Sequence, residues 1–351
     1  MTDGFFTTET QRTQRVTQGI RKIVRDGLLL CAVVLLSGCQ LTTAIDAYRD
    51  GDAVAADQRM LFYGQDVLAE PGEPVELVAR LRKPKSFRGV ADVVVSFDEG
   101  GQRLGLAVTD KDGVARLAYT APGTPGDVTV TVAPVAAPDK LRKDNRDALQ
   151  LRYDLLVAVR RTDARFVVVD LDHTIVDAGA FEVVVGEPPA MAHAVDVLRR
   201  LSERNGYNIL YLTQRPDILT RKSRLWLTDN RFPPGVLVTV RTKEMMSDTA
   251  EVKTRRLKPF TARWENIVVG VGDREGDAHA YLANGMRAYV IPNLGDGSKD
   301  ADEKRKRAAA MLRRLGDNPN VQAVRSWLQI EQSLTQGKRF PAMELAAELD
   351  P

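Results

Sequence analysis

The chain has 351 residues, which is long enough for two domains that each bury a core. Hydrophobic residues make up 44% of the sequence and charged residues 28%, the balance of a folded globular protein. A formal net charge of +3, with no dense basic run among aromatic residues, argues against nucleic acid as a partner. Two cysteines are too few for a disulfide framework.

Residues 1–38 have the pattern of an export signal. Basic side chains precede an apolar run at 28–36, which is too short to cross a bilayer because a spanning helix takes about 20 residues. The run ends in Leu36-Ser37-Gly38-Cys39, which resembles a bacterial lipobox. The resemblance implies that Cys39 is lipidated and anchors the protein at the bacterial cell envelope, at the outer membrane or the periplasmic face. The alternative is a cysteine that follows a short core helix by chance.

The next part of the chain predicts a tether followed by an all-β domain. Residues 39–60 are polar and rich in alanine, as in a tether, and the β-type pattern covers 61–160. Short strands are predicted at 75–81, 93–97, 114–119 and 128–132, with glycine- and proline-rich turns between them. This spacing predicts a β-sandwich. The stretch 109–115, followed by Ala121-Pro122-Gly123, resembles bacterial immunoglobulin-like modules. We expect a spacer or packing module, with a surface-binding role as the alternative.

Residues 161–340 predict an α/β domain, so the whole chain is expected to be multidomain. Apolar runs predict strands at 166–169, 209–212, 236–240, 267–271 and 288–291. Helical stripes fall between the runs, including Ala192, Val195, Leu198 and Leu201, and a further helix is predicted at 323–334. Strands that alternate with helices indicate a Rossmann-like parallel sheet covered on both faces.

Polar side chains gather after the predicted strands, where the ligands of open parallel sheets bind. Asp170, Asp172 and Thr174 follow the first strand, and Thr213, Gln214 and Arg215 follow the second. Lys253 precedes the fourth strand, and Asp273 and Asp277 follow it. We therefore expect these groups to converge at one edge of the sheet.

This set resembles the motifs of the haloacid dehalogenase (HAD) superfamily. Asp170-Leu171-Asp172-His173-Thr174 matches its Asp-x-Asp-x-Thr motif, and Gly272-Asp273-Arg274-Glu275-Gly276-Asp277 matches its Gly-Asp-x-x-x-Asp motif. Thr213 matches the Ser/Thr that ends the second strand, and Lys253 is the best match for the superfamily lysine, with Lys243 and Lys258 nearby. A turn or helix cap is the structural alternative for Asp170, a helix cap for Thr213, and a solvated helix position for Lys253.

The resemblance implies an Mg²⁺-dependent phosphatase with a HAD-like fold. Asp170 would be the nucleophile that forms an aspartyl-phosphate, and Asp172 the general acid and base. Asp170, Asp273 and Asp277, with the backbone carbonyl of Asp172, would form the metal site. Thr213 would bind a phosphate oxygen, Gln214 and Arg215 would also bind the substrate, and Lys253 would hold the nucleophile and the transferring group. His173 has no assigned role.

The gaps between the motifs leave room for only a minimal cap, and an open site suits a bulky or membrane-presented substrate. The segment 210–216, with the helix after it and Pro233-Pro234-Gly235, resembles the catalytic domain of lipin-type phosphatidate phosphatases, although that group commonly has Gly at the position of His173 and Asn at that of Asp273. The substrate expected is phosphatidate or another phospholipid. The alternatives are a soluble nucleotide or sugar phosphate, or a non-catalytic envelope binding protein. The basic cluster Arg215, Arg221, Lys222 and Arg224 would face anionic head groups or form a solvated helix face.

Overall fold

The computed structural model describes residues 60–83, 86–139, 141, 149–178, 187–245, 247–295 and 298–350. The predicted signal peptide, Cys39 and residues 39–59 of the predicted tether lie outside the described residues. In the part of the chain that is described, no helix combines the length and the apolar composition needed to cross a membrane.

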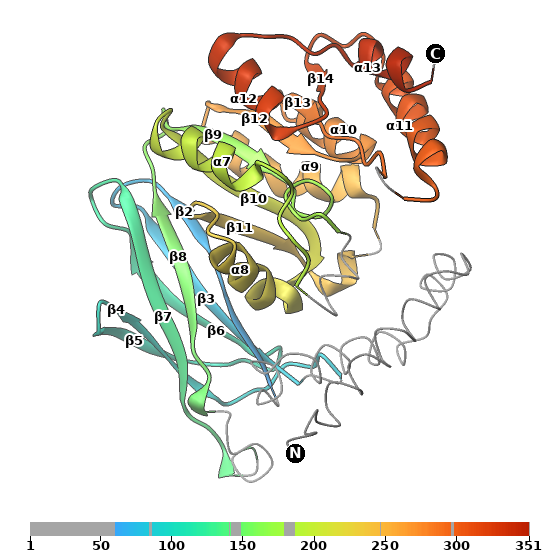
Figure 1. The fold of residues 1–351 in the computed structure, drawn as a ribbon. Coiled ribbons are helices and arrows are strands. Elements are labelled where there is room, and N and C mark those ends of the chain that lie inside the picture. Colours follow the sequence, from blue (N-terminus) through green and yellow to red (C-terminus); the bar gives the residue numbers. More distant parts are fainter. Residues whose placement is uncertain are drawn as a thin grey trace, which may run out of the picture.

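Two β-sheets pack around one core in the first part of the described chain (Figure 1). The three-stranded sheet is antiparallel and has the order β1 (Leu61–Gln65), β3 (Pro74–Arg82), β6 (Val114–Thr120). The five-stranded sheet has the order β2 (Val67–Ala69), β8 (Tyr153–Val159), β7 (Gly126–Ala136), β4 (Val94–Glu99), β5 (Gln102–Val108). The four strands predicted in this region are confirmed, and their inward residues form a sandwich core that includes Leu77, Phe97 and Val130. Its kinship with immunoglobulin-like modules stays a prediction.

The second part contains a parallel α/β sheet of six strands. Its spatial order is β11 (Gly235–Val240), β10 (Tyr207–Pro216), β9 (Arg165–Val169), β12 (Ile267–Gly272), β13 (Arg287–Val290), β14 (Val321–Ala323). All neighbouring pairs are parallel. The chain builds outward from β9 first on one side and then on the other, so the carboxyl end of β9 lies at the topological switch point, where open α/β sheets bind ligands.

Helices cover both faces of this sheet, which explains the uninterrupted apolar run of β9. Val167 and Val169 face a cluster shared with α7 (Ala194–Glu203), α8 (Thr220–Asp229) and α12 (Trp327–Gln336). Phe166 and Val168 face a cluster shared with α9 (Thr249–Thr261), α10 (Glu275–Ala283), α11 (Ala301–Leu315) and α13 (Ala342–Leu349). The five predicted strands of this domain are therefore confirmed, with both faces buried as expected.

The predicted helices of the α/β part differ in detail from those observed. Ala192 is exposed, and α7 instead buries Ala194, Val197, Leu198 and Leu201. The helix predicted to begin at residue 323 is wrong at its start: residues 321–323 form β14, and α12 begins at Trp327. A three-residue strand is too short to show a period of two, so its apolar residues were indistinguishable from a helical face.

The two parts meet along β11 and α8, which lie nearest the sandwich (Figure 1). The buried Asp66 carboxylate, between β1 and β2, accepts hydrogen bonds from the backbone N–H groups of Leu156 in the sandwich (2.9 Å) and Leu237 in β11 (2.8 Å). It also pairs with Arg224 of α8. Leu68 and Ala158 of the sandwich join the apolar cluster on one face of the parallel sheet.

Candidate active site

The chain turns sharply after β9, and this turn separates the side chains of Asp170 and Asp172. The backbone N–H of Asp170 still donates to Val271 of β12 (2.9 Å), so Asp170 continues the strand. The next carbonyl, that of Leu171, accepts from the N–H groups of Ile175 and Val176, each at 2.9 Å. Extended backbone therefore ends at Leu171, and the two carboxylates face different neighbours.

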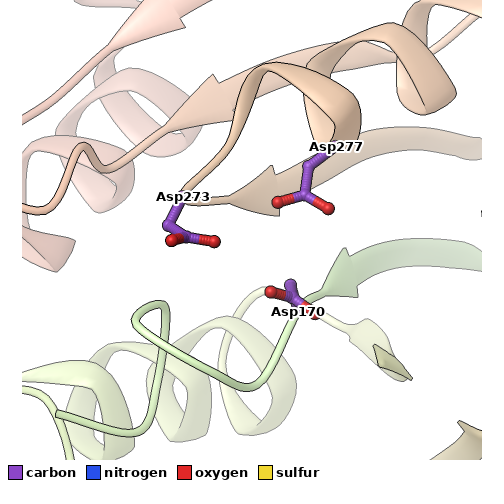
Figure 2. Close-up of side chains that lie close together, drawn as sticks. All are labelled: Asp170, Asp273 and Asp277. Carbon is purple, nitrogen blue, oxygen red and sulfur yellow. The ribbon is translucent and has the colours of Figure 1, made fainter. Parts of the chain in front are cut away.

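Asp170 faces two further carboxylates from the next strand and helix. Asp273 follows β12, and Asp277 lies in the first turn of α10 (Figure 2). Each of the three residues offers an oxygen, and these oxygens all lie within 4.8 Å of one another. All three residues are buried. Gly272 permits this approach, because a Cβ at that position would lie 2.5 Å from the Cβ of Asp277.

Lys253 is the cation inside this carboxylate group. Its ammonium, on the buried face of α9, donates to Asp170 at 2.7 Å and to Asp277 at 2.5 Å. The residue is 2% exposed, so the alternative of a solvated helix position is wrong. Lys243 and Lys258 are exposed. Lys253 is thus the lysine that meets the predicted nucleophile, as the motif match implied.

The cluster carries more negative charge than Lys253 neutralises. Burial, followed by the nearby carboxylates Asp277 and Asp172, raises the pKa of Asp170 to about 7, although Lys253 opposes the shift. Burial and the same kind of repulsion raise the pKa of Asp273 well above its usual range. Burial disfavours the charged form of Lys253, but Asp170 and Asp277 outweigh it and raise its pKa. The electrostatics therefore favour an additional cation.

The donor set fits Mg²⁺, which prefers carboxylate oxygens and few protein ligands. Asp170 and Asp273 are the best placed of the three. Asp277 is already engaged, since one oxygen accepts from Lys253 and the other from the backbone N–H of Arg274 at 3.1 Å. Asp172 was expected to contribute only its backbone carbonyl, and its side chain lies outside the carboxylate group.

The side chain of Asp172 is held by Arg215. The guanidinium donates from Nη2 to one carboxylate oxygen at 2.6 Å and from Nε to both oxygens at 3.1 Å. Its Nη1 donates to the Ser223 hydroxyl of α8 at 3.0 Å. The Arg215 side chain is completely buried. Arg215 therefore contacts the predicted acid/base, and its predicted contact with substrate stays a prediction.

Thr213 and Gln214 lie at the end of β10, beside Arg215. Thr213 is fully buried, and its hydroxyl accepts from the backbone N–H of Arg215 at 3.1 Å; it lies within a strand, so the helix-cap alternative is wrong. The Gln214 amide donates to the Ser247 carbonyl (2.8 Å) and accepts from the Thr249 hydroxyl (2.5 Å). Gln214 thus ties β10 to the start of α9, the helix that carries Lys253. Phosphate binding by these two residues stays a prediction.

Several residues of the basic cluster around α8 have partners inside the protein. Lys222 is buried, and Arg224 pairs with Asp66 at the domain boundary. Arg221 donates to the carbonyl of Arg152 at 2.6 Å. A fully solvated face is therefore wrong for Arg215 and Lys222, and contact of the cluster with anionic head groups stays a prediction. Sequence spacing could not reveal this, because the partners are distant in the chain.

His173 occupies a backbone conformation that favours glycine. Its φ is 55°, in the left-handed region, which His tolerates better than most residues. The ring is half-buried, and its Nδ1 lies 3.2 Å from the side-chain amide of Asn293.

The site has supporting residues that sequence analysis missed. Ser223 orients Arg215, Arg274 lies 3.6 Å from the Asp273 carboxylate, and Asp217 holds the segment that follows Arg215. None belongs to a recognised motif position, and their contacts come from the fold. For Arg274, its place inside the Gly-Asp-x-x-x-Asp stretch was the one available signal.

One family model matches the α/β part of the chain. Residues 167–294 match the family described as "PITM 1-3, LNS2 domain", a segment that includes Asp170, Thr213, Lys253 and Asp273. Membrane-associated phosphatidylinositol transfer protein 3 of Mus musculus is 28% identical over 197 residues, which cover 54% of this chain and 18% of that protein. Membrane-associated phosphatidylinositol transfer protein 1 of Homo sapiens is 32% identical over 141 residues, which cover 39% of this chain and 11% of that protein.

Among solved structures, D,D-heptose 1,7-bisphosphate phosphatase from B. bronchiseptica, complexed with magnesium and phosphate, aligns with 50% of this chain and 99% of its own length. The sequence identity is 10% and the TM-score is 0.36. The chain spans less than a fifth of the length of the curated relatives that it matches. Residues 167–294 of the parallel-sheet part are therefore similar to the LNS2 domain family of PITM 1-3.

Proposed function

We propose that the protein is an Mg²⁺-dependent phosphomonoesterase with Asp170 as nucleophile. The observation that carries the proposal is the contact between Asp170 and the buried Lys253 at the switch point of the sheet, beside Asp273 and Asp277. A carboxylate in a solvated turn or a helix cap would not be surrounded by two further buried carboxylates and one buried ammonium. Such an arrangement suits a site that handles phosphate, because it combines a nucleophile with positive charge.

The residues divide the reaction into two steps. In the first, an Asp170 oxygen forms a bond to phosphorus while the ester P–O bond breaks, and Asp172 gives its proton to the leaving oxygen. In the second, Asp172 takes a proton from water as the water oxygen attacks the same phosphorus, which releases phosphate and restores Asp170. Arg215 fixes the position and plane of the Asp172 carboxylate for both proton transfers. When bound, Mg²⁺ offsets the repulsion between Asp170 and the phosphate dianion.

For the substrate we propose phosphatidate or another phospholipid. Two observations support a lipid: the match to the LNS2 domain of proteins named for phosphatidylinositol transfer and membrane association, and the small size of the insertions between motifs. The described residues between β9 and β10 contain α7, and those between β10 and α9 contain η2 (Asp217–Leu219), α8, β11 and η3 (Thr242–Glu244). A lipid anchor on Cys39 at the envelope would bring such an open site close to its substrate.

Two alternatives have distinct outcomes. A soluble nucleotide or sugar phosphate would serve the same chemistry without a membrane. A non-catalytic lipid-binding role is favoured by the relatives, which are named for transfer rather than hydrolysis. The presence of both Asp170 and Asp172 argues for catalysis, because a binding protein has no need of a nucleophile paired with an acid/base.

Phosphate release from a substrate panel tests these possibilities. We would compare phosphatidate and lysophosphatidate in vesicles with nucleotides and sugar phosphates, each with Mg²⁺ and with chelator. The proposal predicts Mg²⁺-dependent release that is greatest with phosphatidate and absent in a folded Asp170→Asn variant. Turnover in that variant would contradict the nucleophile. Vesicle binding without any release would favour the non-catalytic role.

The envelope location has its own test. A Cys39→Ser substitution removes the proposed site of lipidation and leaves the described domains intact. We expect it to move the protein from the membrane fraction to the soluble fraction. Retention of the Cys39→Ser variant in the membrane fraction would contradict the proposed anchor.

A further inference from the structure

The segment that carries Arg215 leaves the regular sheet before it reaches the sandwich. β10 pairs with β11 in register up to Leu212↔Val238, and the pairing resumes at Pro216↔Val240 with a shift. Residues 213–215 therefore form an irregular stretch between two paired positions. Arg215, the last residue of this stretch, contacts Asp172, and the sandwich contacts the chain two residues later, at Asp217.

Asp217 holds the segment that follows Arg215 through polar contacts with the sandwich. Its carboxylate is buried, and one oxygen accepts from the Tyr63 hydroxyl of β1 at 3.0 Å and from Arg82 of β3 at 3.4 Å. The other oxygen accepts from the Thr242 hydroxyl, beyond β11, at 2.8 Å. Two of the three donors thus come from the sandwich, more than 130 residues away in the chain.

Apolar packing fixes the same segment. Ile218 and Leu219 of η2 are each 8% exposed and form a small cluster of their own with Leu61 and Phe87 of the sandwich. Leu61 also packs against the sandwich core, so this cluster adjoins that core, whereas it shares no residue with the two clusters of the parallel sheet. The sandwich therefore contacts the segment with a charged cluster and an apolar one, immediately after the site residues.

We propose that the sandwich positions Asp172 for proton transfer, and that Asp217 is the positioning residue through which it acts. Contacts run from Tyr63 and Arg82 to Asp217, along two peptide units to Arg215, and from Arg215 to both oxygens of Asp172. A spacer would need none of these contacts. The inference rests on the proposed phosphatase function for its kinetic consequence, whereas the structural coupling stands apart from that function.

Two variants and one matched control test the coupling. Asp217→Asn keeps the size of the side chain but removes the negative charge to which three side chains donate hydrogen bonds. Tyr63→Phe removes one of these donors, a hydroxyl of the sandwich. Tyr119→Phe is the control, because its hydroxyl also donates to a carboxylate, that of Glu99 at 2.8 Å, but both residues lie within the sandwich. The melting temperature of each variant identifies any general loss of folding.

The kinetic readout is the dependence on the leaving group. A poor alkoxide leaving group needs a proton from Asp172, whereas the p-nitrophenolate of p-nitrophenyl phosphate leaves without one. In Asp217→Asn we expect kcat for an alkyl phosphate to fall by about tenfold or more, with a loss below about threefold for p-nitrophenyl phosphate. Tyr63→Phe should show the same pattern to a smaller extent, and Tyr119→Phe no pattern. Equal losses on both substrates would overturn the assignment to Asp172.

Hydrogen exchange tests the coupling without reference to activity. Amides in 213–219 should exchange faster than wild type in Asp217→Asn and Tyr63→Phe, and at the wild-type rate in Tyr119→Phe. Unchanged exchange in both test variants would overturn the inference even if the enzyme is active. If wild type releases no phosphate from any substrate, the proposed function fails, and the exchange result alone decides whether the sandwich positions this segment.

Discussion

At the edge of the parallel sheet, two groups of side chains differ in the cation that contacts their carboxylates. On the side formed by β9, β12 and α10, three carboxylates lie together, and two of them, Asp170 and Asp277, accept from the ammonium of Lys253. The third, Asp273, lies 3.6 Å from Arg274. On the side formed by β10 and α8, one carboxylate, that of Asp172, accepts from both Nε and Nη2 of a single guanidinium, that of Arg215. We refer to these as the lysine side and the arginine side of the site.

The difference indicates that Asp170 and Asp172, two aspartates of one motif, have different roles. A lysine ammonium is a compact point charge that can sit between Asp170 and Asp277, and it leaves carboxylate oxygens over for a metal ion and for attack on phosphorus. An arginine fork fixes both the position and the plane of the carboxylate that it binds. The lysine side is therefore suited to bond making at phosphorus, and the arginine side to orienting a proton-transfer group.

After the complete loss expected for Asp170→Asn, the largest effect is predicted for Lys253→Met, which removes the ammonium of the lysine side. We expect kcat to fall by a factor on the order of 10²–10³, because transition-state charge loses a buried partner. Without Mg²⁺ the melting temperature should also fall, since three buried carboxylates then repel one another. Lys258→Met in the same helix is the control, as Lys258 is exposed. Wild-type turnover by Lys253→Met would mean that the lysine side is not used in catalysis.

Mg²⁺ should stabilise the folded protein through the lysine side alone. At a concentration about 100 times its dissociation constant, an ion bound only by the folded state adds about 2.7 kcal/mol to the free energy of unfolding. We expect the melting temperature to rise with Mg²⁺ in wild type and to return with chelator. Asp273→Asn should lose this response, and Asp172→Asn should keep most of it. Equal responses from these two variants would contradict the assignment of the metal to one side.

Arg215→Lys tests the arginine side at constant formal charge. Lysine cannot reproduce the fork that contacts both oxygens of Asp172, so we expect kcat on an alkyl phosphate to fall about tenfold, equivalent to about 1.4 kcal/mol. The Mg²⁺ response of the melting temperature should persist, because the lysine side is unchanged. If the Mg²⁺ response disappeared as well, the two sides would not be independent.

The smallest effect is predicted for a bidentate ion pair outside the site. Arg200 of α7 donates to both oxygens of Glu331 of α12, at 2.6 and 2.7 Å, with side chains 32% and 22% exposed. Arg200→Gln should leave kcat unchanged and lower the free energy of unfolding by about 0.5 kcal/mol, measured from urea midpoints at pH 7. The hydrogen bond from Arg200 lowers the pKa of Glu331 in the folded protein. The ion pair therefore contributes its full stabilisation above the pKa of about 4.3 that Glu has in the unfolded chain. The stabilisation is lost as the pH falls through the pKa of Glu331 in the folded protein. Below that pH, wild type and Arg200→Gln should have equal stability.

Local patterns were enough to predict the centre of the sheet and the convergence at its edge. β9 is apolar throughout because both of its faces are covered, and the carboxylates follow where that cover ends. Strand order then brings Asp170, Asp273 and Asp277 together without any further information, because β9 and β12 are neighbours. Lys253 was distinguishable from Lys243 and Lys258 only by its match to the motif.

Contacts between distant segments could not be predicted in this way. The importance of Asp66 and Asp217 comes from partners up to 171 residues away, so neither carboxylate differs in sequence from an ordinary loop residue. The same holds for Arg224. Its sequence neighbours indicate a basic helix face, whereas the structure pairs it with Asp66. Charged residues at a domain boundary pair across it, and a pattern within one helix contains no information about the other side.

The most direct test of the account is to trap the intermediate on Asp170. Wild-type protein mixed with substrate and Mg²⁺ would be quenched in acid, digested, and analysed by mass spectrometry for a hydroxylamine-labile phosphate. We predict a hydroxylamine-labile phosphate on the wild-type peptide that contains Asp170. We predict no such phosphate in the Asp170→Asn variant. Phosphate release with no modified peptide, or a modification that persists in Asp170→Asn, would contradict the central role of this carboxylate.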